Sequence, residues 1–430
     1  MAEWKTTYAE KLAFGTMGAD WQDRINWERL RNERCAKGFG MMKKHGYPAF
    51  ILTLPENQRY MTHLHPGCIA GFVAGGAGFS VVFAEHQDDT RSWMTEGNIA
   101  RQSQFHCPWL KPENIKAVHS MSVNQGPVAV AEMCKKNAAE IVQAIKDHGL
   151  ENEKIGIDAP IPGIMPYLKD AGLNIETAPN VFFEARECKT QDEIKALQMA
   201  GCIADIAWGK LAEIMRPGLR ENQMGAEMAA ALQGAGAQET FVVSLRTGPN
   251  TAPNYLSHSP VDRIVQPGDM LVCDLIGPVY MGYRICYYRT FAVGIPPKQE
   301  IKDAYQEIRD WLYAAADLVK PGASTADIVK AWPEYTEWGY DNEDECWSNA
   351  LGHGIGLGQY ELPNLRRSSS IEFPQEIKKN QTIAMETWKG VDRYWGVRIE
   401  NLYLVTDKGA ENLYSWPDEE IICPWKQRML

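Results

Sequence analysis

One histidine in the second half of this 430-residue chain lies in a segment suited to proton transfer or ligand binding. Seven of the nine histidines fall within residues 1–148, which leaves His258 and His353 beyond them. His353 stands in "ALGHGIGLG", where alternate glycines let backbone approach closely and leave an imidazole uncovered. A structural histidine fits the same turn, so neighbouring chemistry has to decide its role.

Three carboxylates supply that chemistry. Asp274 lies in "MLVCDLIG", Glu386 in "TIAMETW" and Glu400 in "VRIENLYLV", and each acid interrupts a segment that otherwise has the pattern of a buried strand. An isolated buried carboxylate is costly, so three of them indicate partners, a metal ion or a function. The sequence therefore predicts one acidic site built on several strands.

The elements that carry these residues divide the chain into two predicted domains. Residues 1–185 alternate apolar runs with helical patterns, which predicts an α/β domain with strands at 48–54, 78–84, 115–121 and 153–159. Residues 186–430 begin with a long amphipathic helix that stops at Pro217-Gly218. Further helical patterns and strand candidates predict an α+β domain there, with strands at 239–248, 269–277, 282–291, 381–388 and 394–406.

Composition excludes several functional classes. The 44 basic and 55 acidic residues give a net charge of −11, and no basic run interrupts them, so we expect no nucleic-acid partner. No segment offers about 18 consecutive apolar residues, so no membrane span is expected. The ten cysteines form no CxxC pair, and the N-terminus has no uninterrupted apolar stretch. These features predict a cytoplasmic protein with reduced thiols.

The second half resembles a known family in order along the chain. The segments "SHSPVDRIVQPGDMLVCDLIG", "GYRICYYRTF", "LGHGIGLGQYELP", "AMETW" and "RIENLYLVTDKG" resemble the pita-bread fold of creatinases, prolidases, aminopeptidases P, methionine aminopeptidases and one class of dimethylsulfoniopropionate lyases. The resemblance implies a creatinase-type α/β domain over 1–185 and a pita-bread catalytic domain over 186–430. It also implies a homodimer with its active site near the subunit interface and a small-molecule substrate.

The metal ligands of the family's peptidases are incompletely matched. Those enzymes bind two divalent ions through two Asp, one His and two Glu, and four of these positions correspond to Asp274, His353, Glu386 and Glu400. The fifth position is Cys286 in "GYRICYYRTF". A carboxylate oxygen is a harder ligand than a thiolate, so this change disfavours a dinuclear centre. We therefore expect no cofactor, with one divalent metal ion held by the four matching residues as the alternative.

Two further departures disfavour a peptidase. The family's "HExP" segment is "YELP" here, with Tyr360 in place of His, and Asn254 stands where another peptidase histidine is found. Creatinase uses this fold without a metal, and the position of its catalytic histidine matches His258 in "HSPVDRIVQPGD". The resemblance makes His258 the leading general base, with His353 as a second proton-transfer residue and the acid cluster as its electrostatic support.

The predicted function is a metal-independent lyase that acts on a small organic molecule by elimination or C–C cleavage. The substrate is either a small cation, such as a sulfonium compound, or a lignin-derived aromatic that loses formaldehyde. The alternatives are a creatinase-type C–N hydrolase, an Xaa-Pro-type metallopeptidase and a non-catalytic binding module. Candidate catalytic residues are His258, His353, Glu386, Glu400, Asp274 and Tyr360, and candidate substrate-binding residues are Tyr255, Cys286, Tyr288, Arg246, Trp347, Trp388, Trp395, Arg398, Tyr60 and His65.

Overall fold

The computed structural model divides the chain into two compact units, each described by itself below. It describes residues 24–64, 78–95, 97–237, 242–252, 260–346 and 351–424. One unit is Arg31–Glu187, and the other joins Cys188–Leu430 to the described residues before Arg31. The helix α2 (Trp27–Lys44) begins in one unit and ends in the other.

The N-terminal unit is a six-stranded mixed sheet in the order β4-β3-β2-β1-β5-β6. Its strands are β1 (Ala49–Leu52), β2 (Gly78–Phe83), β3 (Arg91–Met94), β4 (Ile115–Ala117), β5 (Lys154–Ile157) and β6 (Asn174–Thr177). β1 pairs with β2 antiparallel and with β5 parallel. Both central strands are buried along their whole length, which explains why their sequences are continuous apolar runs.

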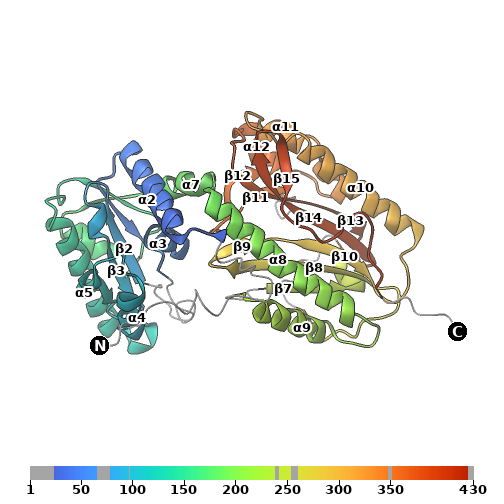
Figure 1. The fold of residues 1–430 in the computed structure, drawn as a ribbon, viewed down its shortest axis with the longest axis horizontal. Helices are drawn as coiled ribbons and strands as arrows, with labels where there is room; N and C mark the ends of the chain where they lie inside the picture. The colour runs from blue at the N-terminus through green and yellow to red at the C-terminus, as the bar shows by residue number, and fades with distance from the viewer. Residues whose placement is uncertain are drawn as a thin grey trace. The chain divides into compact units, whose positions relative to one another are not determined.

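Helices complete this unit (Figure 1). They are α3 (Pro55–Thr62), α4 (Gly97–His106), α5 (Pro127–Lys146), α6 (Met165–Asp170) and α7 (Asn180–Glu187). α5 places Ala138, Ile141 and Ile145 on one face, and these side chains pack into the core formed with β1, β2 and β5. The apolar spacing of 128–149 thus has its physical cause in one buried helix face.

The C-terminal unit holds two antiparallel sheets. The first has the order β10-β8-β7, with β9 also paired to β8, and comprises β7 (Val242–Thr247), β8 (Met270–Tyr280), β9 (Tyr283–Ile285) and β10 (Tyr288–Ala292). The second has the order β12-β11-β13-β14-β15 and comprises β11 (Gly352–Gly354), β12 (Glu361–Leu365), β13 (Thr382–Val391), β14 (Trp395–Thr406) and β15 (Gly409–Asn412).

Long helices pack against these sheets (Figure 1). α8 (Gln191–Ile214) and α9 (Glu221–Gly234) contact the first sheet, whereas α10 (Gln299–Ala316) contacts β13 and β14; the short helices α11 (Thr325–Val329) and α12 (Arg367–Glu372) pack on each other. α8 begins with a capping box, because the Thr190 side chain accepts from the Glu193 amide and Glu193 accepts from the Thr190 amide. The charged segment before this helix is therefore its start signal.

The two sheets of this unit meet at β10 and β14. The Thr290 hydroxyl donates to the Arg398 carbonyl at 2.7 Å, and the Arg398 amide donates back to that hydroxyl at 2.9 Å. The Arg289 guanidinium donates to the Glu400 carbonyl at 2.6 Å. These bonds fix the positions of Asp274 on β8 and Glu400 on β14, because β8 and β10 are directly paired.

The predicted architecture is confirmed: an α/β domain precedes an α+β domain with antiparallel sheets. Two strands of the first domain, β3 and β6, are not predicted: both are only four residues long, β6 is largely exposed, and β3 is buried but begins with the polar pair Arg91 and Ser92. "GYRICYYRTF" is two strands rather than one, since β9 ends at Ile285 and β10 begins at Tyr288. Among the described residues, no helix is long and apolar enough to cross a membrane.

Candidate active site

Three buried carboxylates from three strands converge in the C-terminal unit. Asp274 lies on β8, Glu386 on β13 and Glu400 on β14, with exposed fractions of 0%, 6% and 0%. Glu386 and Glu400 are direct cross-strand partners, so their side chains leave the same face of the sheet. Like charges in this arrangement repel each other and require compensation by a cation or by protons.

Asp274 is incompletely satisfied. Its Oδ1 accepts from the Tyr287 amide at 3.0 Å, whereas its Oδ2 meets no hydrogen-bond geometry among the described residues, with the Tyr288 hydroxyl as the side chain that stabilises its charge. Burial raises the pKa of this carboxyl to about 7, and the charge of Glu386 adds to the shift. A carboxylate oxygen in this state is suited to a cation.

Glu400 carries a larger cost of burying a carboxylate than Asp274 does. Within the described part of the chain neither Oε atom meets the geometry of a hydrogen bond, although the residue is fully buried, and the Cys286 thiol is the side chain that stabilises its charge by hydrogen bonding. Burial raises the pKa of Glu400 well above its usual range, and the charges of Glu386 and Asp274 raise it further. Leaving both oxygens of a buried acid unpaired is destabilising unless a ligand completes the site.

Glu386 has a partner already. Its Oε2 accepts from Arg398 Nε at 2.8 Å and also from Arg398 Nη2. The Arg398 guanidinium carbon lies 4.0 Å from the ring centroid of Tyr288 and 5.0 Å from that of Trp388, so two aromatic faces hold the cation. Burial alone would lower the pKa of Arg398, but the neighbouring Glu386 raises it overall. Arg398 is thus a fixed positive charge within the acid cluster.

His353 is oriented by its own backbone. It lies on β11 with 3% of its surface exposed, and Nδ1 lies 3.0 Å from the Gly354 carbonyl. Because a carbonyl can only accept, Nδ1 carries the proton and Nε2 keeps a lone pair. Burial lowers the pKa of the imidazole. The Gln359 carbonyl also lies within hydrogen-bonding reach of this ring, and one ring nitrogen lies within ligand distance of Cys286 and Glu400.

Tyr360 covers this imidazole. The two ring centroids lie 4.6 Å apart at an interplanar angle of 57°, and Tyr360 is 67% exposed. Its pKa is raised to about 12 by partial burial, and the charge of Glu386 contributes to the shift. The phenol therefore keeps its proton in the field of the acid cluster while remaining accessible to solvent.

Cys286 lies in the break between β9 and β10. The hydrogen-bond ladder stops there because the Cys286 amide donates to the Tyr414 hydroxyl, which in turn donates to the Cys286 carbonyl. The Tyr287 amide donates to the Asp274 side chain instead of to a neighbouring strand. One ligand atom each from Cys286, His353 and Glu400 lie within 4.8 Å of one another, and all three residues are buried. Burial raises the pKa of the thiol well above its ordinary value. These thiol, imidazole and carboxylate donors, together with unpaired carboxylate oxygens, fit a divalent metal ion.

A buried ion pair fixes the glycine-rich turn that carries His353. Lys189 Nζ lies 2.8 Å from Glu361 Oε2, and their side chains are 1% and 0% exposed. Glu361 Oε1 accepts from the Gly358 amide at 2.8 Å. A Cβ at Gly356 would lie 2.7 Å from Glu361 Oε2 and 3.0 Å from Lys189 Cε, so this position needs glycine. Neither Lys189 nor Glu361 was predicted; Glu361 is the one charge in "QYELP", whereas Lys189 lies in the charged segment "ECKT", where the sequence does not distinguish it.

The other predicted residues have varied positions. His258, Tyr255, Trp347 and His65 lie outside the described residues, so their roles stay predictions. Trp388 stacks on Trp338 at 5.0 Å within the core, and Trp395 packs against that core while partly exposed.

Arg246 is buried on β7 and faces Val272 across the ladder. Tyr60 is buried in the N-terminal unit, where its hydroxyl donates to the Ala185 carbonyl at 2.9 Å, which leaves its ring little access to a ligand.

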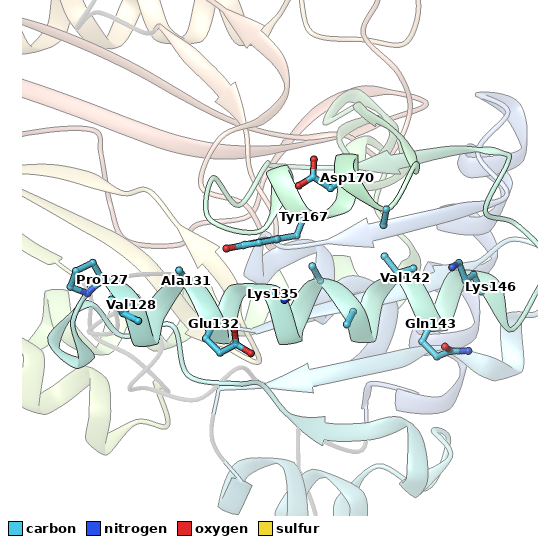
Figure 2. A pocket seen from close by; sticks show the side chains of 13 residues that line it. Pro127, Val128, Ala131, Glu132, Lys135, Val142, Gln143, Lys146, Tyr167 and Asp170 are labelled. Carbon is cyan, nitrogen blue, oxygen red and sulfur yellow. The ribbon is translucent and has the colours of Figure 1, made fainter.

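A groove lies in the N-terminal unit, remote in sequence from the acid cluster. Figure 2 shows side chains of α5 along one wall and Tyr167 and Asp170 of α6 along the other. Alanines, Val128 and Val142 make much of its lining. Its described lining contains neither histidine nor cysteine, so the groove has no ligand set comparable to that in the C-terminal unit.

Fold and site together define a class: a two-domain pita-bread protein with a buried cluster of acids, histidine and thiol. Residues 195–407 match the model of metallopeptidase family M24. Residues 195–407 are therefore an M24 domain of the pita-bread type, and solved structures share the fold of the chain.

Named relatives of the chain are peptidases. It is 27% identical over 266 residues to the probable dipeptidase PepE of Mycobacterium bovis, covering 62% of this chain and 68% of the relative. It is 28% identical over 237 residues to the Xaa-Pro dipeptidase of Pyrococcus furiosus, covering 54% and 65%. The solved prolidase of Pyrococcus horikoshii OT3 superposes with a TM-score of 0.67 at 22% identity, covering 91% of this chain and 100% of the prolidase. This last likeness shows the shared fold.

These relatives overturn the predicted function. The prediction of a metal-independent lyase is wrong, because the relatives are named dipeptidases and prolidases rather than lyases. The predicted substrates of that lyase, a lignin-derived aromatic compound or a sulfonium compound, are therefore wrong as well. The prediction of no cofactor is also wrong, because the matching family is one of metallopeptidases. The physical reason is that the thiol of Cys286 is itself a metal ligand, so loss of a carboxylate at this position does not remove the site's capacity for an ion.

Proposed function

We propose that this chain is a metal-dependent peptidase that hydrolyses the C–N bond of dipeptides, with Xaa-Pro dipeptides as its first substrate class. The observation that carries the proposal is the buried group of Cys286, His353 and Glu400, whose carboxylate has no hydrogen-bond partner among the described residues. The match of residues 195–407 to a metallopeptidase family and the similarity to relatives named Xaa-Pro dipeptidase support the same reaction.

The proposed roles follow from the geometry of the site. Cys286, His353 and Glu400 would hold the ion. Asp274 Oδ2 is a buried carboxylate oxygen that a cation would also stabilise. When bound, the ion would polarise the scissile carbonyl as a Lewis acid. The chain's own contribution is to keep the His353 proton on Nδ1, next to the Gly354 carbonyl. Nε2 then keeps a lone pair that it can give to a metal ion.

Tyr360 and Arg398 supply the polar groups beside the ligands. The exposed Tyr360 phenol keeps its proton and can donate a hydrogen bond to a substrate oxygen or to the leaving amine. Arg398 fixes Glu386 and balances part of the negative charge of the cluster. This combination of donors and a charge-balanced cluster supports hydrolysis of a small polar substrate.

The proposal is tested by peptide hydrolysis with the full-length protein. The protein is stripped with a chelator and reloaded separately with zinc, cobalt or manganese. Ala-Pro, Gly-Pro and the non-proline control Ala-Ala are then supplied, and free amino acids are quantified. We expect hydrolysis that disappears on chelation and returns on reloading. Absence of dipeptide hydrolysis with every ion, in protein shown to be folded and loaded, would overturn the proposal.

Assembly and location belong to the same proposal. We propose a homodimer whose active site lies near the subunit interface, as the family resemblance implies. A cytoplasmic location is proposed from the scattered cysteines, which form no CxxC pair. Analytical ultracentrifugation of the loaded protein tests the dimer, because a monomer at micromolar concentration would contradict it.

A further inference from the structure

We propose that the site binds a single, thiolate-ligated ion of the zinc type, and that Arg398 serves as the second positive charge of the cluster. The inference rests on the proposed function only in assuming that a metal ion is used. It concerns the number of ions and the identity of their ligands, which can be measured without any substrate.

Ligand geometry favours one ion. Cys286, His353 and Glu400 form the group whose donor atoms lie mutually within 4.8 Å, and they come from three separate segments of one unit. Glu400 brings two oxygens without a hydrogen-bond partner among the described residues, and it is fully buried. A neutral thiol alone would not demand a cation, whereas this buried and unpaired carboxylate does.

The formal charge of the acid cluster bears on how many divalent ions it binds. The three carboxylates carry a formal charge of −3 when ionised, and Arg398 reduces it to −2. One divalent ion balances this charge. Loss of the Cys286 proton on binding leaves the cluster at −1 with one ion and at +1 with two, so the occupancy of Glu386 by Arg398 decides between the two numbers. A buried excess charge is costly, and here Glu386 is already occupied by Arg398 through two donors.

The donor types select the kind of ion. A thiolate, an imidazole nitrogen and a carboxylate oxygen together suit zinc and cobalt, whereas magnesium and manganese prefer oxygen ligands. On this chain, the residue that replaces a carboxylate ligand therefore sets metal preference as well as metal number. Arg398 is held between Tyr288 and Trp388 and thus cannot leave the cluster easily to admit another ion.

Cys273 provides a matched control for Cys286. Both thiols are buried, and Cys273 precedes Asp274 on β8. Because successive side chains on a strand leave opposite faces, Cys273 points away from the face that carries Asp274. Replacing either cysteine by alanine removes one buried thiol from the same sheet, but only Cys286 belongs to the proposed ligand group.

The test is a titration of metal-stripped, full-length protein with cobalt(II). Bound cobalt per chain is measured by elemental analysis after dialysis, and the near-ultraviolet spectrum is recorded for a thiolate-to-cobalt charge-transfer band. We expect one cobalt per chain, a charge-transfer band, and displacement of cobalt by zinc but not by magnesium. Cys286→Ala should lose the band and weaken cobalt binding at least tenfold, whereas Cys273→Ala should keep both.

Several results would overturn the inference. Two cobalt ions per wild-type chain would remove the charge argument, and a band that persists in Cys286→Ala would exclude this thiolate. Circular dichroism reports whether Cys286→Ala is folded, and Cys286→Ser serves as a second variant that keeps the side-chain volume. Chelator-sensitive dipeptide hydrolysis with two bound ions would refute the inference and leave the proposed function standing. One thiolate-bound ion without dipeptide hydrolysis would refute the proposed function and leave the inference standing.

Discussion

Lys189 Nζ and Glu361 Oε2 lie 2.8 Å apart in a fully buried ion pair. Glu361 also accepts from the Gly358 amide and stands opposite Gly354, whose carbonyl orients His353. Two chain segments more than 170 residues apart are thereby joined at the turn that carries the imidazole. The pair therefore connects the stability of the fold to the geometry of the site.

Breaking this pair should destabilise the protein and weaken metal binding. Lys189→Met leaves Glu361 as an uncompensated buried charge, which should cost about 3–5 kcal/mol in the free energy of unfolding measured with urea. The double variant Lys189→Met/Glu361→Gln should recover most of this loss, because no buried charge remains.

An exposed ion pair supplies the control. Lys379→Ala removes the pair with Asp407, whose side chains are 52% and 73% exposed, and should change stability by less than about 1 kcal/mol. The informative readout is cobalt affinity per folded chain. If Lys189→Met lost stability but bound cobalt as tightly as the wild type, the pair would not position the ligands.

Removing Arg398 should open the cluster to more positive charge. In Arg398→Met, the buried Glu386 loses both donors and faces Glu400 without compensation. We expect the metal-free variant to be about 3–5 kcal/mol less stable than the wild type. Added zinc should raise its melting temperature more than that of the wild type, because the ligand binds only the folded state. An equal zinc response in both proteins would contradict the role given to Arg398.

Replacing the Tyr360 phenol should slow catalysis without affecting the fold. Tyr360→Phe keeps the ring on His353 but removes the proton donor, and the side chain is 67% exposed. Loss of a hydrogen bond to a charged group costs about 1.5–3 kcal/mol, so kcat for dipeptide hydrolysis should fall at least roughly tenfold. KM, bound metal and melting temperature should stay near wild-type values. A rise in KM alone would assign Tyr360 to substrate binding.

His63 should give the N-terminal unit a distinct loss of stability in acid. Arg34 Nη2 lies 2.7 Å from His63 Nδ1, and burial followed by the Arg34 charge lowers the pKa of His63 to about 2. The unfolded pKa is about 6.5. The stability from the neutral ring is therefore complete above pH 6.5 and is lost as the pH falls toward the folded value.

The measurement compares urea unfolding at pH 7.5 and pH 5.0. Between these conditions, His63 should remove about 2 kcal/mol from the wild type. His63→Gln can still accept from Arg34 but does not titrate, so it should lack this part of the loss. Equal pH dependence in both proteins would show that the imidazole is not held neutral in the folded state.

Much of the fold was predictable because its signals are local. The buried strands β1, β2 and β8 are apolar runs, and α8 starts at a capping box that is visible in "TQDE". The carboxylates were recognisable because each one interrupts such a run. The break at Cys286 was not predictable, because it depends on hydrogen bonds to Tyr414 and Asp274, which are distant in sequence.

The chemistry of the site was harder to predict than its residues. Sequence placed Asp274, Glu386 and Glu400 in one site, but it could not reveal that Arg398 pairs with Glu386, since Arg398 looks like any strand arginine. It also could not show that Cys286 comes within ligand distance of His353 and Glu400. Without that geometry, a missing carboxylate suggested a missing metal.

The most direct measurement follows dipeptide hydrolysis while the metal-stripped protein is titrated with zinc. The account predicts no hydrolysis without metal, activity that rises in proportion to bound zinc, and saturation at one ion per chain. Absence of hydrolysis by folded protein at every zinc loading would contradict its central claim.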